Sequence, residues 1–114
     1  MEISIYAIPG INTPPEQIIC ECFGINRSML FAKTRKREVV EARHFYFYMK
    51  IRENGYSGYS KLGMETGFDH STLIYAVKNV DNLLMTDKTF QGKAKKALMQ
   101  LKQAKQYEHD SDAI

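Results

Sequence analysis

The chain has 114 residues, 44% of them hydrophobic and 25% charged, which suits one globular domain with a single modest core. Its formal net charge is +3, but all 16 lysines and arginines lie between Arg27 and Lys105, where seven acids leave a balance of +9. This charge favours a polyanionic partner, although a merely solvated surface would share it, and no stretch is long enough to span a bilayer or reads as a secretory signal.

The first predicted helix begins near Thr13, where a capping threonine is followed by Pro14-Pro15 and Glu16 as first-turn proline and acid. Residues 1–13 are expected to form an irregular N-terminal arm. Gly24 ends this helix, and Asn26 can cap a short second one. Cys20 and Cys22, two apart in a helical pattern, suit neither a zinc pair nor an easy disulfide, so we expect reduced thiols in a cytoplasmic protein.

Four cations in five residues follow, between two helical patterns: Lys33, Arg35, Lys36 and Arg37. We call residues 33–37 the basic segment and expect it to be an exposed loop. A long central helix is predicted from Glu38 to Arg52. Its apolar side chains keep helical spacing, so they are interpreted as core and not as a stacking platform for single strands: Val39, Ala42, Phe45, Tyr46 and Met49.

Two closely joined helices come next, one around Ser60–Glu65 that ends at Gly67 and one that begins at Asp69 or His70. Their tight connection is typical of a helix-turn-helix. The second helix is predicted to bury Leu73, Ala76, Val77, Val80 and Leu84. Its opposite side then presents Ser71, Ile74, Tyr75, Lys78 and Asn82.

A final helix is predicted from Thr86-Asp87 to about Gln106, with five side chains facing inward: Phe90, Ala94, Ala97, Leu98 and Leu101. Residues 107–114 are expected to be an acidic flexible tail. The predicted fold is therefore all-α, a compact domain over residues 14–106 with about five to six helices and a helix-turn-helix.

The string Asp69-His70-Ser71-Thr72-Leu73-Ile74-Tyr75-Ala76 resembles the signature of the C-terminal DNA-binding domain of the bacterial replication initiator DnaA, Asp-His-Thr/Ser-Thr-Val-hydrophobic-His-Ala. Upstream, the basic segment followed by Ala42-Arg43 resembles the basic loop and long-helix start of the same family, at the matching spacing. The resemblance covers roughly residues 15–103.

The resemblance implies sequence-specific binding of double-stranded DNA, with the recognition helix in the major groove. Ser71 and Thr72 can add hydrogen bonds where free backbone N–H groups at the helix start favour a phosphate. Asp69 can accept from a cytosine amino group, and His70 can meet a thymine methyl group or a base acceptor. Asp69 also fits a plain N-cap, and both roles can hold at once.

The basic segment supplies the second expected contact, since Arg35 matches the minor-groove arginine of the family. The rest of the basic segment and the start of the long helix are expected to contact phosphates, through Lys33, Lys36, Arg37 and Arg43. The outer face of the recognition helix is expected to add Tyr75 and Lys78. Tyr75 replaces the usual histidine of the signature.

The sequence also departs from the family before the recognition helix. Thr66-Gly67-Phe68 stands where the family has Gly-Gly-Arg, and Tyr59-Ser60-Lys61 where it commonly has Leu-Pro followed by an acid or lysine. The initiator-box specificity is therefore not carried over. If residue 68 faces DNA, Phe68→Arg should steepen the salt dependence of binding by about one unit; if Phe68 fills the core, the substitution should destabilise the domain.

Other function classes are disfavoured by what the chain holds. It has no Gly-rich Walker loop, so we expect neither nucleotide binding nor ATPase activity, and no cofactor or metal. Catalysis by Asp69, His70 and Ser71 is disfavoured because consecutive residues at a helix start project about 100° apart. We expect a monomer on each DNA site, acting in replication initiation or regulation. The alternative is a protein-interaction module that presents Ile74 and Tyr75.

Overall fold

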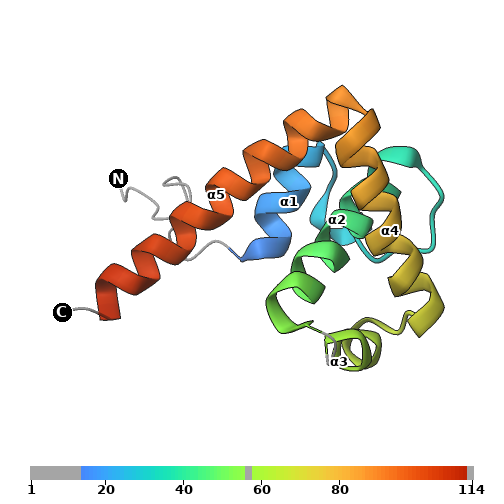
Figure 1. The fold of residues 1–114 in the computed structure, drawn as a ribbon, viewed down its shortest axis with the longest axis horizontal. Helices are drawn as coiled ribbons and strands as arrows, with labels where there is room; N and C mark the ends of the chain where they lie inside the picture. The colour runs from blue at the N-terminus through green and yellow to red at the C-terminus, as the bar shows by residue number, and fades with distance from the viewer. Residues whose placement is uncertain (1–13, 56–57, 113–114) are drawn as a thin grey trace.

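The computed structural model describes residues 14–55 and 58–112, and the expected N-terminal arm (residues 1–13) lies outside the described residues. The elements are α1 (Pro15–Phe23), the 3-10 helix η2 (Arg27–Met29), α2 (Arg37–Asn54), α3 (Gly58–Thr66), α4 (His70–Thr86) and α5 (Lys88–Asp112). Figure 1 shows their order along the chain. The described part contains helices and no strand, which confirms the predicted all-α fold.

Local sequence signals account for the ends of the first two helices. The N-cap of α1 is Pro14, without a side-chain cap, so the expectation that Thr13 caps this helix is wrong by one position. Gly24 ends α1 in the left-handed region, at φ 73°, which glycine adopts without steric cost. Asn26 caps η2 as predicted, because its side-chain oxygen accepts from the Ser28 N–H at 3.1 Å.

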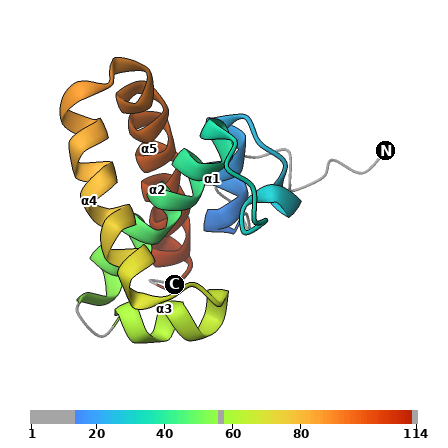
Figure 2. The same cartoon turned by 90° about the vertical axis from the view of Figure 1, so that its right-hand side faces the viewer.

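The core is organised around α2, which packs against α1, α3 and α4. Figure 2 shows α2 enclosed between α1 on one side and α4 and α5 on the other. Phe45 of α2 is fully buried, with its ring 5.5 Å from Phe23 of α1 and 6.1 Å from Phe90 of α5. The interpretation of the α2 aromatics as core is thus confirmed for Phe45 and Tyr46.

The last helix, α5, begins where the sequence predicts and differs from that prediction in two details. Asp87 accepts from the Phe90 N–H at 3.0 Å, and Phe90, Ala94 and Ala97 are buried. Leu98, predicted to face inward, is 42% exposed because it lies eight residues after Phe90 and therefore about 80° around the helix from it. The helix extends to Asp112, beyond the expected end near Gln106, while the flexible tail stays a prediction.

Two further observations bear on partners. No helix within the described ranges combines the length and apolar character needed to cross a membrane. Both cysteines are free thiols, with Cys20 buried and Cys22 half-buried. Burial raises the pKa of each thiol, so both groups stay protonated and weakly nucleophilic near neutral pH.

Candidate nucleic-acid interface

Helices α3 and α4 are joined by a turn of three residues, Gly67, Phe68 and Asp69. Gly67 has φ 79°, and its N–H bonds to the Gly63 carbonyl at 2.9 Å, which closes the end of α3. A Cβ atom added at Gly63 would lie 3.1 Å from the Phe68 carbonyl oxygen, so glycine permits the close approach of the turn to α3. The start of the second helix at His70 agrees with the predicted helix-turn-helix.

Asp69 is the N-cap of α4, since its Oδ1 accepts from the Thr72 N–H at 2.8 Å. Hydrogen bonding from the Thr72 side chain, and then from the Thr72 N–H, lowers the pKa of the Asp69 carboxyl, and the positive charge of Lys33 adds to the same effect. The capping interpretation is confirmed. Capping engages one of two carboxylate oxygens, so a second acceptor role for Asp69 is compatible with it.

The two faces of α4 separate as predicted. Leu73, Ala76 and Val80 are fully buried against the core. On the other side, Tyr75 is 63% exposed and Ile74 is half-buried. The remaining side chains on this face, together with the first residue of the helix, are exposed: His70, Ser71, Lys78 and Asn82. One side of α4 is therefore a polar surface with an aromatic side chain at its centre.

The basic segment is exposed between η2 and α2, with one correction at its end. Arg37 is the first residue of α2, whereas we expected it in the loop. Its guanidinium pairs with Glu41 and with Asp87, each at 3.0 Å. These two carboxylates offset its charge, so Arg37 contributes less to a positive surface than Lys33, Arg35 and Lys36 do.

Phe68 joins the basic segment to the turn before α4. Its ring packs against Phe47 of the core, with centroids 5.3 Å apart and an edge-to-face arrangement. The ammonium nitrogen of Lys33 lies 4.5 Å from the centroid of the Phe68 ring, and the Arg43 guanidinium carbon 5.4 Å from it. Phe68 is half-buried, so the alternative in which it contributes to the core agrees with its placement.

Arg43 is more buried than the sequence suggested. We expected it near the DNA backbone, but it is only 7% exposed. Its Nε donates to the Leu30 carbonyl at 2.8 Å, and its Nη2 donates to the Ala32 carbonyl. Burial and these two bonds to protein carbonyls disfavour the expected phosphate contact, which stays a prediction. Arg43 instead holds the chain just before the basic segment.

Sequence reasoning missed the partners of His44, which lies beneath α4. His44 is 7% exposed, its ring lies 5.8 Å from the Tyr75 ring, and the Asn79 amide nitrogen is 3.0 Å from its Nδ1. Burial, with the nearby Arg43 charge, lowers the pKa of His44 to about 4. Its position beside Arg43 in an apolar helix was the only available signal, and it did not indicate α4 as the partner.

The depressed pKa of His44 predicts acid-sensitive stability. The unfolded chain binds a proton near the ordinary pKa of 6.5, whereas the folded chain does so only near 4. We expect the free energy of unfolding to fall as pH drops from about 6.5 toward about 4, above the window in which Asp69 and Asp87 titrate. Urea midpoints across this range should decline for the native sequence and much less for His44→Gln. Equal declines would refute this origin.

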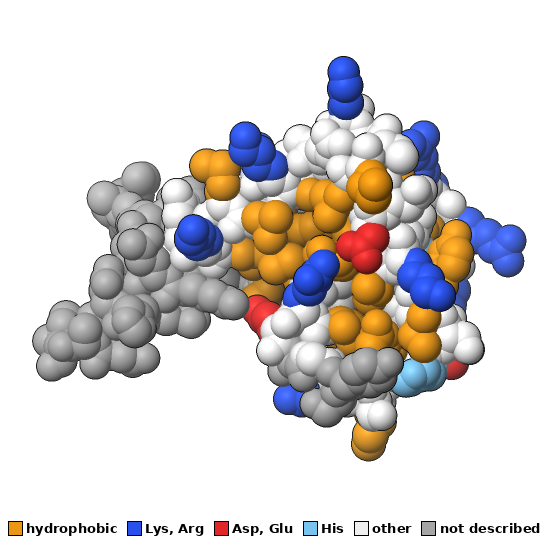
Figure 3. Space-filling view, viewed as in Figure 1, with side chains coloured by type: hydrophobic (Ala, Val, Ile, Leu, Met, Phe, Trp, Pro, Cys, Tyr) orange, Lys and Arg blue, Asp and Glu red, His pale blue; other side chains and the backbone are white. Residues whose placement is uncertain are grey.

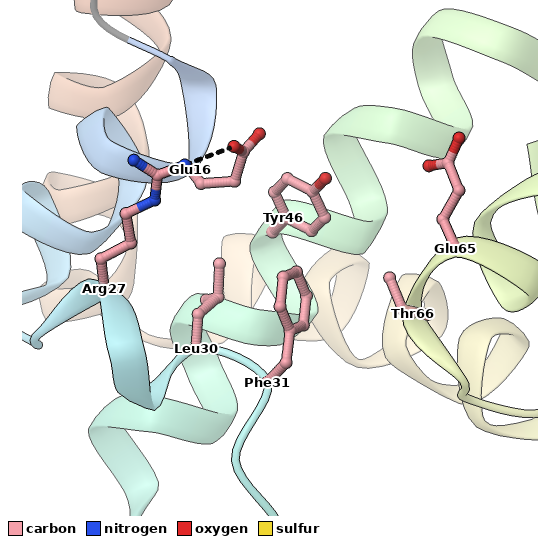
Figure 4. Close-up of a pocket in the computed structure, with 7 residues that line it drawn as sticks. All are labelled: Glu16, Arg27, Leu30, Phe31, Tyr46, Glu65 and Thr66. Atoms are coloured by element: carbon pink, nitrogen blue, oxygen red, sulfur yellow. Dashed lines mark hydrogen bonds and ion pairs between the residues drawn. The ribbon is translucent and has the colours of Figure 1, made fainter.

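A groove of about 350 Å³ lies between α1, η2, α2 and α3. Figure 4 shows Phe31 and Tyr46 at its centre, with Glu16, paired to Arg27 at 3.4 Å, on one side and Glu65 on the other. Carboxylates on both sides disfavour a phosphate backbone here. Figure 3 shows apolar side chains across the middle of the viewed face, with cationic and acidic side chains among them and further cations toward the edge. No group of three or more candidate metal ligands occurs among the described residues.

The family described as the bacterial DnaA protein helix-turn-helix matches residues 16–80, more than half of the chain. The chain therefore belongs to the DnaA helix-turn-helix family. It is 38% identical over 76 residues to the chromosomal replication initiator protein DnaA of Bacteroides thetaiotaomicron and 37% identical over 76 residues to that of Flavobacterium psychrophilum. Each match covers 66% of this chain and 16% of the relative.

A more distant DnaA relative, from Thermus thermophilus, is 32% identical over 92 residues, covering 77% of this chain and 21% of the relative. The chain thus spans about a sixth to a fifth of the length of these DnaA proteins. No solved structure gives a significant match. The DnaA family match includes the basic segment and the first eleven residues of α4, His70 to Val80.

Proposed function

We propose that this chain binds double-stranded DNA sequence-specifically, with the exposed face of α4 in the major groove and the basic segment in an adjacent minor groove. The observation that carries the proposal is the contact between Lys33 and Phe68, which holds the basic segment beside the start of α4. Two cationic or polar elements fixed on one side of a helical scaffold can meet one duplex together.

The start of α4 would supply the major-groove contacts. Ser71 can donate to a phosphate near the helix N-terminus, where the backbone dipole favours negative charge, and Thr72 can add its hydroxyl group. Asp69 and His70 would read base edges, with His70 exposed for this purpose. Tyr75 and Lys78, both exposed on the next turns, would extend the contact along the groove.

The basic segment would supply the minor-groove and backbone contacts. Arg35 is exposed, and its planar, weakly hydrated guanidinium suits a narrow groove with strong negative potential. Lys33 and Lys36 would neutralise phosphates, and Arg37 would do so only by leaving its pairs with Glu41 and Asp87. The guanidinium is 75% exposed but the Glu41 side chain only 12%, so this exchange costs more than breaking a fully exposed ion pair.

Selection of bound duplexes from a random pool tests the proposal directly. A specific site should be enriched, and binding should weaken steeply as salt rises. Recovery of no preferred sequence would reduce the function to electrostatic association. An absence of salt-sensitive duplex binding would favour the second candidate, a protein-interaction surface, which the 63% exposed Tyr75 on α4 supports.

For Arg35→Ala, we expect specific binding to weaken by about 1–3 kcal/mol with little change in melting temperature, because the side chain is exposed. Fluorescence anisotropy on the selected duplex and on a scrambled duplex measures the effect. Lys36→Ala is the matched control, since it removes a charge from the same segment and should weaken both duplexes alike. Equal losses on both duplexes for Arg35→Ala would assign Arg35 to phosphate binding.

The bounds of the DNA-binding unit, its stoichiometry and its biological role belong to the same proposal. We infer a DNA-binding unit over residues 14–106 that acts as a monomer on each site, in replication initiation or its regulation. It contributes neither nucleotide binding nor catalysis. Gel-filtration of the protein–duplex complex tests the stoichiometry, and an ATP hydrolysis assay tests the absence of catalysis.

A further inference from the structure

We propose that Phe68 is a positioning residue for DNA binding, which holds the ammonium group of Lys33 beside the start of α4 so that both contact the same stretch of duplex. This inference rests on the proposed function and deepens it. It concerns a contact between two residues that lie 35 positions apart in the chain.

The ring of Phe68 is itself held in place by contacts with other side chains of the protein. It packs edge-to-face on Phe47, and Phe47 stacks at 6.2 Å with Phe31, which lies two residues before Lys33. The Phe68 N–H lies 3.4 Å from the Thr66 hydroxyl oxygen, which accepts from it and ties the turn to α3. The ring therefore has a defined position before any ligand arrives.

The position of the Lys33 ammonium group is given by its contact with the Phe68 ring, and the electrostatics of the N-cap agree with it. The ammonium nitrogen lies 4.5 Å from the Phe68 centroid, within the range in which the negative face of an aromatic ring attracts an ammonium group. Hydrogen bonding from Thr72 is the main cause of the lowered pKa of Asp69, and Lys33 adds to it through its charge. The Lys33 ammonium thus lies near the N-cap of the recognition helix as well as over the ring.

The backbone just before the basic segment is held by Arg43, which donates to the carbonyls of Leu30 and Ala32 and whose guanidinium carbon lies 5.4 Å from the centroid of the same ring. A long lysine side chain otherwise samples many rotamers, and ordering it at the moment of binding costs affinity. Because Phe68 restricts Lys33 in the free protein, the loss of the ring should act on DNA binding mainly through Lys33.

The first test uses NMR on the free protein and does not depend on DNA. The ε-methylene protons of Lys33 should be shifted upfield by the Phe68 ring relative to those of Lys36, in the same exposed segment. Phe68→Tyr should retain this shift and Phe68→Leu should abolish it. Absence of the upfield shift in the native sequence would overturn the inference, whether or not any variant folds.

The second test measures the salt dependence of duplex binding. Each neutralised phosphate contributes about −0.9 to the slope of log affinity against log salt, so Lys33→Met and Phe68→Leu should each reduce the slope by close to one unit. The double variant should lose no more than either single variant, whereas Phe68→Tyr should retain the native slope. A merely structural Phe68 would change the melting temperature without changing the slope.

Additive slope changes in the double variant, or an unchanged slope in folded Phe68→Leu, would overturn the positioning role. The two hypotheses fail in different ways. If the native protein shows no salt-dependent binding to any duplex, the proposed function fails, and the role of Phe68 in DNA binding fails with it. If binding is salt-dependent but its salt slope does not change when the Phe68 ring is removed, only the positioning role fails.

Discussion

Arg43→Ala is expected to lower the free energy of unfolding by about 3–4 kcal/mol, the largest loss that we predict for a charged residue. The buried guanidinium donates to two backbone carbonyls, those of Leu30 and Ala32. Hydrogen bonds from a charged donor contribute about 1.5–3 kcal/mol each, and their removal leaves buried acceptors without a partner. Urea denaturation followed by circular dichroism measures the change.

Arg52→Ala is the matched control on the same helix, because Arg52 is exposed and its ion pair with the exposed Asp81 is long, at 3.7 Å. Such a surface pair is expected to contribute less than about 1 kcal/mol. Arg43→Lys should fall between the two, since a single ammonium group cannot reproduce the planar geometry of both bonds. If Arg43→Ala costs no more than Arg52→Ala, the supporting role of Arg43 is refuted.

Phe68→Arg is expected to destabilise the domain by about 2–4 kcal/mol, because it removes an aromatic ring packed on Phe47 and places a third cation beside Lys33 and Arg43. Of the two outcomes that the sequence left open, the contacts of Phe68 favour this one. The melting temperature should drop, and the slope of duplex affinity against salt should not steepen.

Phe68→Tyr is the control for this substitution, because it retains the aromatic ring and leaves the charge of the turn unchanged. It should leave the melting temperature close to that of the native protein. A stable Phe68→Arg variant whose salt slope steepens by about one unit would mean that residue 68 faces the duplex. The placement of the ring between the core and the basic segment would then be wrong.

Much of the fold follows from short-range patterns in the sequence. The spacing of Leu73, Ala76 and Val80 assigns the buried face of α4, and the cap residues Asn26 and Asp69 mark where helices begin. Such features depend on residues within one or two helical turns of each other, so local propensity and periodicity are sufficient. The same reasoning placed Leu98 inward, because periodicity alone does not define how wide the covered stripe of a helix is.

The sequence by itself therefore determined the order of the helices, the caps at Asn26 and Asp69, the exposed face of α4 and the resemblance that indicates DNA. Tertiary structure alone decided which cations are available to a ligand. Arg43 bonds to carbonyls 11 and 13 residues earlier, and Lys33 lies over the ring of Phe68 from a different part of the chain. A motif shows which residues carry charge, but burial and long-range partners, which depend on how helices pack, decide whether that charge faces the duplex or the protein interior.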